Sequence, residues 1–400
     1  MEISNKKLIY IIIYFLICFI SEIFYSNYLY TKSLYFQNGI QNFIKSINFQ
    51  TIFSKITKTG KDWFFIYISL FIGLIFSIKH AYIIFLNVFF VSYIKELLKM
   101  IYHHKRPFWE NSNINIGCST DFGHPSGHSI CSTTGYLILY YFISKRKYFK
   151  KNIIFRFLIF FLFLIYIFLI LISRLNDGVH SLDQVLFGFT LGCGFFILFF
   201  FVFEIDNLKL NQVIEFLNLF IVILFNIISL LLPIGIYYIM KKINNNFPYQ
   251  PPDECLKKQS YLPQFSKLYE KSLISSMKVS LISGCLFSLL YVKYFMKIIN
   301  IDDENKLISW DHHNIYQRIG TFLFILILGY PGYYIYHINF FNKTDKLYVI
   351  LLFKQILPLE ISAFFMFGFG IYISIKMVDI LKKNQSLNES ELYLTSNLDI

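Results

Sequence analysis

Charged residues are scarce in this chain of 400 residues. They make up 15% of it, whereas typical soluble domains carry about 25%, and hydrophobic residues make up 56%. Such a composition excludes a soluble enzyme and a disordered protein. Cysteine is also scarce: six are present with no Cys-x-x-Cys pair, so neither a disulfide-rich secreted scaffold nor a structural zinc site is expected.

Long apolar runs are what the sequence has instead of charge. Most are about 16 to 25 residues long, close to the length that a helix needs to span a bilayer. Backbone groups in hydrocarbon must be satisfied within their own segment, so the runs predict an all-α polytopic membrane protein. The runs lie at 8–25, 63–78, 81–98, 129–144, 154–172, 184–203, 214–240, 273–295, 319–337 and 349–378. Pro358 interrupts the last run, which leaves nine or ten spans.

The basic residues lie mainly in short loops between these runs. The net charge of +13 therefore indicates membrane topology and not nucleic-acid binding. Six Lys and Arg residues and no acid occupy 145–156, which predicts a cytoplasmic loop. The loops 99–128 and 173–183 then face the lumen or exterior. The loop predicted at 26–62 would lie there too despite its five lysines, but long loops follow the rule poorly.

Three clusters of polar residues stand beside the apolar runs on the predicted luminal side. Lys99 and Arg106 are two helical turns apart, so both cations can project from one helix face. The segment Gly123–His128 directly precedes the fourth run, and its Pro-Ser pair is typical of a helix start, where free N–H groups bind anions. After the fifth run, Arg174 is followed six residues later by His180.

Together these residue types suit phosphoryl transfer. Its transition state carries charge on three equatorial oxygens, which lysine, arginine, a serine hydroxyl and backbone N–H groups can stabilise. One neutral imidazole can attack phosphorus, and a second can protonate the leaving oxygen. The attacking imidazole needs an acceptor for its far nitrogen, and Asp183 and Gln184 both lie within about one turn of His180.

The three motifs resemble those of the type 2 phosphatidic acid phosphatase and vanadium haloperoxidase superfamily. They stand here as Lys99-x6-Arg106-Pro107, Pro125-Ser126-Gly127-His128 and Ser173-Arg174-x5-His180. The resemblance implies that His180 is a nucleophile that forms a phosphohistidine and that His128 is the general acid. It also implies a phosphatase that needs no metal or other cofactor. The implied phosphate cradle consists of Lys99, Arg106, Ser126, Gly127 and Arg174.

One position departs from the family pattern. The family usually has Asp four residues after the nucleophile, whereas this chain has Gln184 there, with Asp183 before it. Glucose-6-phosphatases look to have Gln at this position. Either residue can orient His180, and we expect Asp183 to matter more, because a carboxylate stabilises a developing imidazolium better than an amide does.

The resemblance divides the chain into two parts. Residues 1–205 would form a six-helix phosphatase core with its motifs within 99–184, and 206–400 would add transmembrane helices and a cytoplasmic tail. The four apolar runs beyond the core are similar to those of longer sphingosine-1-phosphate phosphatases and nine-span glucose-6-phosphatases.

The function expected is hydrolysis of phosphate monoesters, chiefly of lipids such as phosphatidate or a sphingoid-base phosphate. The expected partners are this substrate and the bilayer, with no nucleic acid, and the oligomeric state stays open. The expected location is the endoplasmic reticulum membrane, with the site facing the lumen. Glucose-6-phosphate and polyprenyl diphosphates are alternative substrates, and an inactive phospholipid-binding relative is an alternative of another class. A transporter would leave the histidines and arginines unexplained.

Polar residues outside the motifs carry weaker predictions. His103 and His104 are adjacent and point apart on a helix, which favours interfacial roles over metal binding. His124 either contacts substrate or is a turn residue. Cys118 and Cys255 are the two loop cysteines, and a disulfide between them is possible on a luminal face.

Overall fold

The computed structural model describes most of the predicted helical segments. The described residues are 5–75, 78–111, 114, 119, 121–146, 149, 151–207, 216–243, 268–297, 315–337 and 347–366. Within these ranges the regular elements are all helices, so the predicted all-α class is confirmed. The predicted pairing of Cys118 with Cys255 lies outside the described residues.

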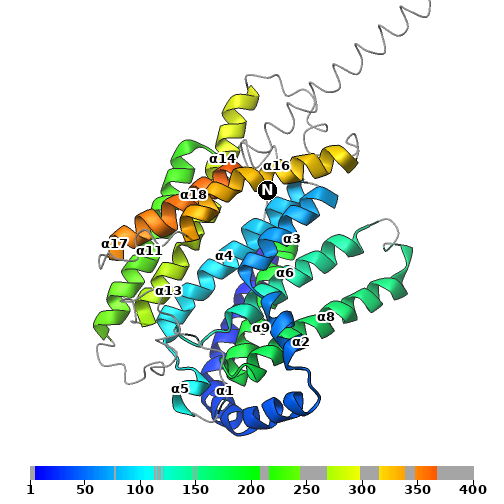
Figure 1. The fold of residues 1–400 in the computed structure, drawn as a ribbon, viewed down its shortest axis with the longest axis vertical. Coiled ribbons are helices and arrows are strands. Elements are labelled where there is room, and N and C mark those ends of the chain that lie inside the picture. Colours follow the sequence, from blue (N-terminus) through cyan, green and yellow to red (C-terminus); the bar gives the residue numbers. More distant parts are fainter. Residues whose placement is uncertain are drawn as a thin grey trace, which may run out of the picture.

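Six long helices form the part of the molecule that carries the motifs. They pack around the contact between α6 and α9, with α1 and α8 each packed against α9. Their bounds are α1 (Asn5–Ser46), α3 (Asp62–Ile75), α4 (Ile78–Tyr102), α6 (Gly127–Ser144), α8 (Ile153–Asn176) and α9 (Leu182–Ile197), which continues as the π-helix η1 (Leu198–Val202). The short helices α2 (Gln50–Lys58) and α5 (Pro107–Glu110) lie toward one end of this group (Figure 1).

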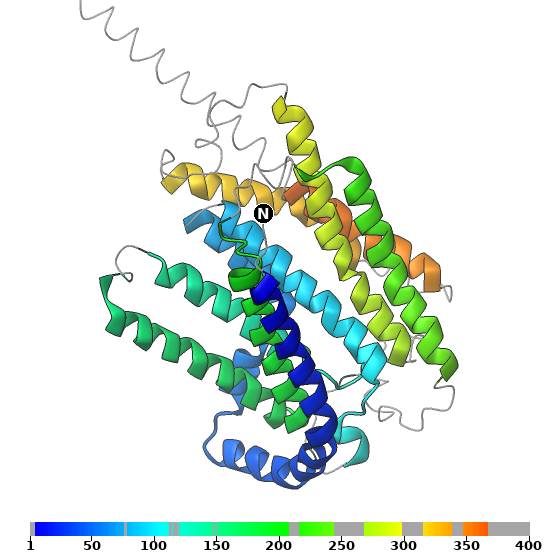
Figure 2. The same ribbon diagram turned by 180° about the vertical axis from the view of Figure 1, so that it is seen from behind.

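The remaining helices form a second group along α4. Within it α11 and α13 contact α4, and α18 packs against α14 and α16. Their bounds are α11 (Leu219–Ile243), α13 (Leu268–Ser276), the 3₁₀-helix η2 (Met277–Val279), α14 (Ser280–Lys297), α16 (Ile315–His337), α17 (Leu347–Val349), the π-helix η5 (Ile350–Ile356) and α18 (Leu357–Phe364). Figures 1 and 2 show α4 lying between this second group and the other helices of the six-helix group.

Two hydrophobic cores meet at α4 because its side chains are apolar on several faces. Val88 and Val91 are fully buried in the core shared with α6, α8 and α9. Phe89, one residue on from Val88, is equally buried in the core shared with α11, α13 and α14. A helix that is apolar all round is a buried one, and α4 is therefore the element that joins the two groups.

Seven helices among the described residues are long and apolar enough to cross a bilayer. They belong to α1, α4, α8, α9 with η1, α11, α13 with α14, and α17 with α18. Three further helices, α3, α6 and α16, coincide with the other predicted apolar runs. The chain is thus an integral membrane protein, as predicted, with up to ten helices in the predicted places.

The loop predicted at 26–62 is helical over most of its length, which corrects the prediction. α1 extends beyond its apolar run to Ser46, and α2 follows after a short turn. The extension is stabilised by polar contacts that hydropathy does not detect: Gln37 and Gln41 are buried, and their side-chain amides donate to backbone oxygens of 176–180.

Candidate active site

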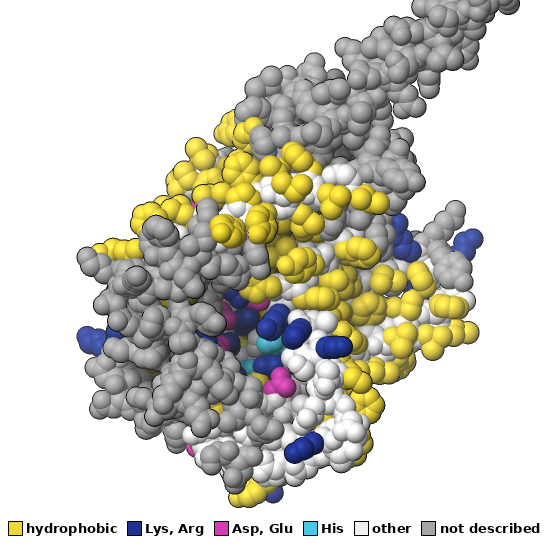
Figure 3. All heavy atoms as spheres, in the orientation of Figure 1, with side chains coloured by type: hydrophobic (Ala, Val, Ile, Leu, Met, Phe, Trp, Pro, Cys, Tyr) yellow, Lys and Arg dark blue, Asp and Glu magenta, His cyan; other side chains and the backbone are white. Residues whose placement is uncertain are grey.

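The three motifs meet at one end of the bundle because of the helix directions. α4 and α8 run toward this end and carry Lys99 and Arg174 in their last turns, whereas α6 starts there just after Ser126. His180 lies in the short connection between α8 and α9. Figure 3 shows basic, acidic and histidine side chains gathered in a hollow that hydrophobic side chains border on one side.

The imidazole of His180 is buried and held at both nitrogens. Its Nδ1 lies 2.8 Å from the backbone oxygen of Gly123 and 3.1 Å from Oε1 of Gln184. Both are acceptors, so Nδ1 carries the proton and donates it. Nε2 lies 3.3 Å from Nη1 of Arg106, which can only donate. The neutral tautomer therefore presents the lone pair of Nε2 to the cations.

The surroundings of His180 keep the ring neutral. Burial lowers its pKa well below 6.5, and the positive charges of Arg106, Arg174 and Lys99 lower the pKa further. The sign follows from the charge on the protonated ring, because burial and nearby cations both disfavour imidazolium. A neutral imidazole is the form that can act as a nucleophile.

Asp121 organises the two cations of the first motif, and sequence reasoning missed it. Arg106 is 2% exposed and donates from Nη2 to Asp121 Oδ1 at 2.8 Å, while Lys99 pairs with the other carboxylate oxygen. Burial would raise the pKa of Asp121, but Arg106 and Lys99 outweigh it and hold that pKa well below its usual range. The two cations are therefore already fixed in place by an anion.

The turn before α6 brings backbone groups into the site. The N–H of Ser126 donates to the backbone oxygen of Gln184 at 3.0 Å, which ties this turn to α9. A Cβ on Gly127 would lie 2.9 Å from the side chain of Lys95, so this glycine leaves room for the lysine to approach the start of α6. The helix start leaves N–H groups free for an anion.

His128 has the freedom that a proton donor needs. Its Nε2 is buried and makes no hydrogen bond to the part of the chain that the structure describes. Burial and the positive charges of Arg174 and Lys95 lower the pKa of His128 well below 6.5, so the ring takes up a proton only when an anionic phosphate bound beside it raises that pKa again. A ring nitrogen without a partner among the described residues leaves His128 free to exchange a proton with a molecule bound near His180.

Arg174 is anchored but not saturated. Its Nη1 donates to Thr57 Oγ1 and to Asp177 Oδ2, each at 2.7 Å. Its Nε is buried and makes no hydrogen bond to described residues. These contacts to α2 and to the turn after α8 orient the guanidinium. The role of α2 is therefore to hold Arg174, although hydropathy did not predict this helix.

Gln184, and not Asp183, contacts His180, which corrects our expectation for these two residues. Gln184 also donates from Nε2 to the backbone oxygen of Lys105 at 2.8 Å. Gly123 leaves room for the Gln184 side chain, since a Cβ at position 123 would lie only 2.6 Å from Oε1. The carboxylate of Asp183 instead faces His124, 3.8 Å from its Nδ1. The physical reason is that Asp183, one residue earlier on α9, points to another side of the helix.

A second charged cluster adjoins the site and also went unpredicted. Asp62, at the start of α3, lies 2.8 Å from Lys278 and 3.5 Å from Lys95, and it accepts a hydrogen bond from Ser92. Lys95 precedes Lys99 by one turn on α4, a spacing that could have revealed it. Lys278 stands within an apolar run, where a cation is itself a sign of function.

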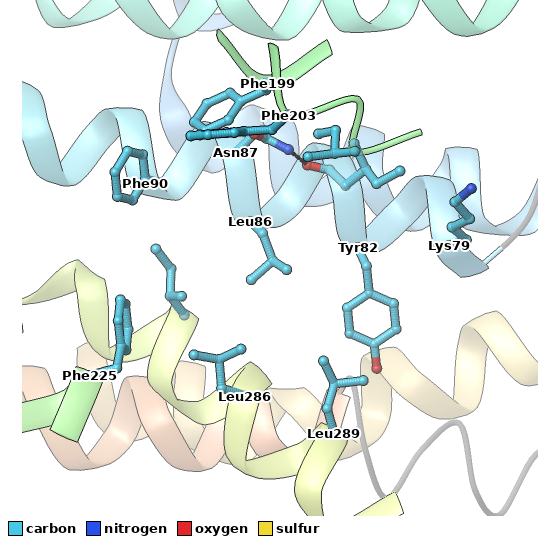
Figure 4. A pocket seen from close by; sticks show the side chains of 13 residues that line it. Lys79, Tyr82, Leu86, Asn87, Phe90, Phe199, Phe203, Phe225, Leu286 and Leu289 are labelled. Atoms are coloured by element: carbon cyan, nitrogen blue, oxygen red, sulfur yellow. Dashed lines mark hydrogen bonds between the residues drawn. The ribbon is translucent and has the colours of Figure 1, made fainter. Parts of the chain in front are cut away.

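A separate apolar cavity of about 340 Å³ lies toward the other end of α4. Figure 4 shows Leu86 and Phe90 of α4 facing Phe225, Leu286 and Leu289 across it. Lys79, at the far end from Lys99, is its charged lining residue. The cavity suits hydrocarbon and carries none of the residues that suit phosphoryl transfer.

Comparison with known proteins agrees with the motifs. Residues 65–207 match the model of the PAP2 superfamily, so the predicted relationship to the type 2 phosphatidic acid phosphatases is confirmed over this region. The chain is also similar to the crystal structure of the first transmembrane PAP2 type phosphatidylglycerolphosphate phosphatase from Bacillus subtilis. That match has a TM-score of 0.43 and 23% identity, and it covers 49% of this chain and 95% of that one. No curated protein matches the chain.

Proposed function

We propose that the chain is a membrane phosphatase that hydrolyses phosphate monoesters through a phosphohistidine at His180, without a metal in the reaction. The observation that carries the proposal is the state of His180. Its ring is neutral, its Nδ1 proton is bound by Gly123 and Gln184, and its Nε2 faces a cluster of fixed cations. This arrangement supports in-line attack on a phosphate held by those cations.

In the first half-reaction Nε2 of His180 attacks phosphorus, and the bond from phosphorus to the ester oxygen breaks. His128 donates its proton to the leaving oxygen, which departs as an alcohol. Arg106, Lys99 and Arg174 stabilise the equatorial oxygens, together with N–H groups at the start of α6. The proton of His180 stays on Nδ1 and is donated in hydrogen bonds to the oxygens of Gln184 and Gly123, which stabilise the positive charge that develops on the ring.

In the second half-reaction His128, now neutral, accepts a proton from water. The water oxygen attacks phosphorus, the bond to Nε2 breaks, and inorganic phosphate leaves. His180 returns to its neutral Nδ1–H form and His128 to its protonated form. The three cations serve both half-reactions, since the charge lies on the same phosphate oxygens.

A lipid substrate is favoured by the apolar surface that reaches the site. Ile172 is 38% exposed and lies two residues before Arg174, and Ile101 is 45% exposed and lies two residues after Lys99. Exposed isoleucines at membrane depth contact lipid tails. A phosphate head group at the cations would therefore leave its hydrocarbon at the bilayer edge, so an amphiphile could enter sideways. The basic loop at 145–156 supports placing this end on the side of the membrane opposite the cytoplasm, which is the luminal side if the chain resides in the endoplasmic reticulum.

Glucose-6-phosphate is the second candidate substrate. The contact of Gln184 with His180 favours it, because glucose-6-phosphatases look to have glutamine at this position. A water-soluble sugar phosphate would reach the same cations from the hollow and would not need the apolar border.

The test is a phosphate-release panel on purified protein in detergent without added metal. It compares phosphatidate, a sphingoid-base phosphate, a polyprenyl diphosphate and glucose-6-phosphate, with His180→Ala as the matched control. We expect one of the two lipid monoesters to have the highest kcat/KM and the variant to be inactive. Preferred hydrolysis of glucose-6-phosphate would replace the lipid assignment, and no release from any of the four would contradict the phosphatase.

A further inference from the structure

A buried cluster of ionisable side chains lies directly behind the catalytic loop, and the reaction does not use it. Glu22 comes from α1, His104 from the segment after α4, and His124 from the loop between Asp121 and Ser126. Glu22 is 1% exposed and His124 is 0% exposed, although both can carry charge. Burying such groups is costly unless they are paired or coordinate a metal.

The three side chains converge on one point. A ligand atom from each lies within 4.8 Å of the others. Nε2 of His124 is 3.1 Å from Oε1 of Glu22, which is the distance of an ion pair. This separation is also close to that of two ligands on a common ion, which is about 3.3 Å for tetrahedral zinc.

The other nitrogen of His124 completes a familiar pattern of metal chemistry. Its Nδ1 lies 3.8 Å from the carboxylate of Asp183, which is buried at the start of α9. A metal-bound histidine usually donates its second N–H to a carboxylate, which fixes the tautomer and raises the basicity of the ligand nitrogen. Asp183 stands where that carboxylate belongs.

We propose that Glu22, His104 and His124 bind a zinc ion, with Asp183 orienting His124. Two imidazoles and one carboxylate are a donor set that zinc accepts, and its fourth position would hold a water. His104 is only half-buried, so its ring can turn inward to shorten the distance to the other two ligands. A cavity of about 220 Å³ is lined by His104 and by Asp183, so it opens beside one ligand and beside the carboxylate that orients another.

The zinc would brace the loop that positions the nucleophile. The N–H of Gly123 donates to the backbone oxygen of His104 at 2.9 Å, and its oxygen accepts from His180. An ion joining His104 to His124 would hold Gly123 between two fixed ligands and fasten both to α1. None of its three ligands belongs to the phosphate cradle, so the ion would position the loop and take no part in phosphoryl transfer.

The test measures metal and does not depend on activity. Untagged protein, purified with equimolar Zn²⁺ and dialysed, is assayed for zinc by mass spectrometry, and its affinity is measured against a chromophoric chelator. We expect one zinc per chain, and about tenfold or greater loss of affinity in His104→Asn and His124→Asn. His103→Asn is the matched control and should keep full affinity, because His103 is adjacent to the site, has a φ of 41° that asparagine tolerates, and is not a ligand.

Cobalt gives a second readout that tolerates a poorly folding variant. Co²⁺ added to the zinc-free wild type should produce the visible absorption of a tetrahedral site, and Zn²⁺ should abolish it. Zinc bound equally by wild type, His104→Asn and His124→Asn would overturn the proposal, as would a wild type that binds neither ion. The cluster would then be a hydrogen-bonded histidine and carboxylate pair.

Discussion

At the scale of residues, the site depends on anions and amides that the motifs do not contain. Asp121 fixes Arg106 and Lys99, and Gln184 fixes His180. The cations and His180 are thereby held in place before any phosphate arrives, which is the condition under which electrostatic stabilisation of a transition state is largest. Each of these supporting contacts can be removed singly.

The first prediction concerns the residue that orients the nucleophile. Gln184→Ala should lower kcat by about tenfold or more, because His180 loses a partner at Nδ1 and Lys105 loses its bond to the amide. Asp183→Asn should cost less, since this carboxylate contacts His124 and not His180. Steady-state kinetics with one substrate checks the order, with Gln184→Glu as the conservative variant that should restore part of kcat. A larger loss in Asp183→Asn would contradict the assigned contacts.

The second prediction is a pH dependence. Because burial and cations hold the pKa of His180 well below 6.5, the nucleophile stays neutral at pH 6, where an unperturbed imidazole would be mostly protonated. The acid limb of kcat/KM, which reports the free enzyme, should therefore lie below pH 6.5 for a substrate whose phosphate is already ionised at that pH. Stability should change in the same sense: below pH 6.5 the unfolded chain takes up a proton that the native ring does not, so stability falls as the pH drops. An acid limb at or above pH 6.5 would show that the ring is not shielded.

At the scale of elements, α4 connects the six-helix group to the C-terminal helices. The C-terminal end of α4 contributes Lys95 and Lys99 to the site, and α13 and η2 pack along this helix. Lys278 of the C-terminal group reaches Asp62 at the start of α3, so one ion pair joins segments 216 positions apart. The C-terminal helices therefore support the site and are not merely an appendage to it.

The third prediction tests that support. Lys278→Met should lower the melting temperature in detergent, because the buried carboxylate of Asp62 loses its nearest cation, at a cost of about 1–3 kcal/mol. The double variant with Asp62→Asn should be less destabilised than the sum of the single changes, since the unpaired charge is then absent. The exposed residue Lys242 supplies the control, and Lys242→Met should leave the melting temperature unchanged. Strict additivity would mean that Lys278 and Asp62 are not coupled.

At the scale of the whole molecule, hydropathy predicted helices that the structure contains, because each apolar run must bury or immerse its surface. The motifs likewise predicted the cations and histidines that the chain brings to one end. Two features could not be predicted because they depend on contacts between distant parts of the chain. One is the extension of α1, whose glutamines donate to backbone oxygens of residues 176–180. The other is the ion pair between Lys278 of η2 and Asp62. The choice between Asp183 and Gln184 also needed the helix register of α9, since one residue changes the direction of a side chain by about 100°.

The most direct test of the central claim is to trap the covalent intermediate. Wild-type enzyme mixed with a labelled phosphate monoester and quenched within one turnover should carry a phosphoryl group that acid removes and alkali does not, located by mass spectrometry on His180. His180→Ala should carry none, and its kcat/KM should fall by about a thousandfold or more, because the covalent step has no substitute. His128→Asn should accumulate label from an aryl phosphate, whose leaving group needs no proton, since the second half-reaction then lacks its base. Turnover by His180→Ala within about tenfold of wild type, or wild-type turnover with no phosphoryl group on His180, would contradict the account.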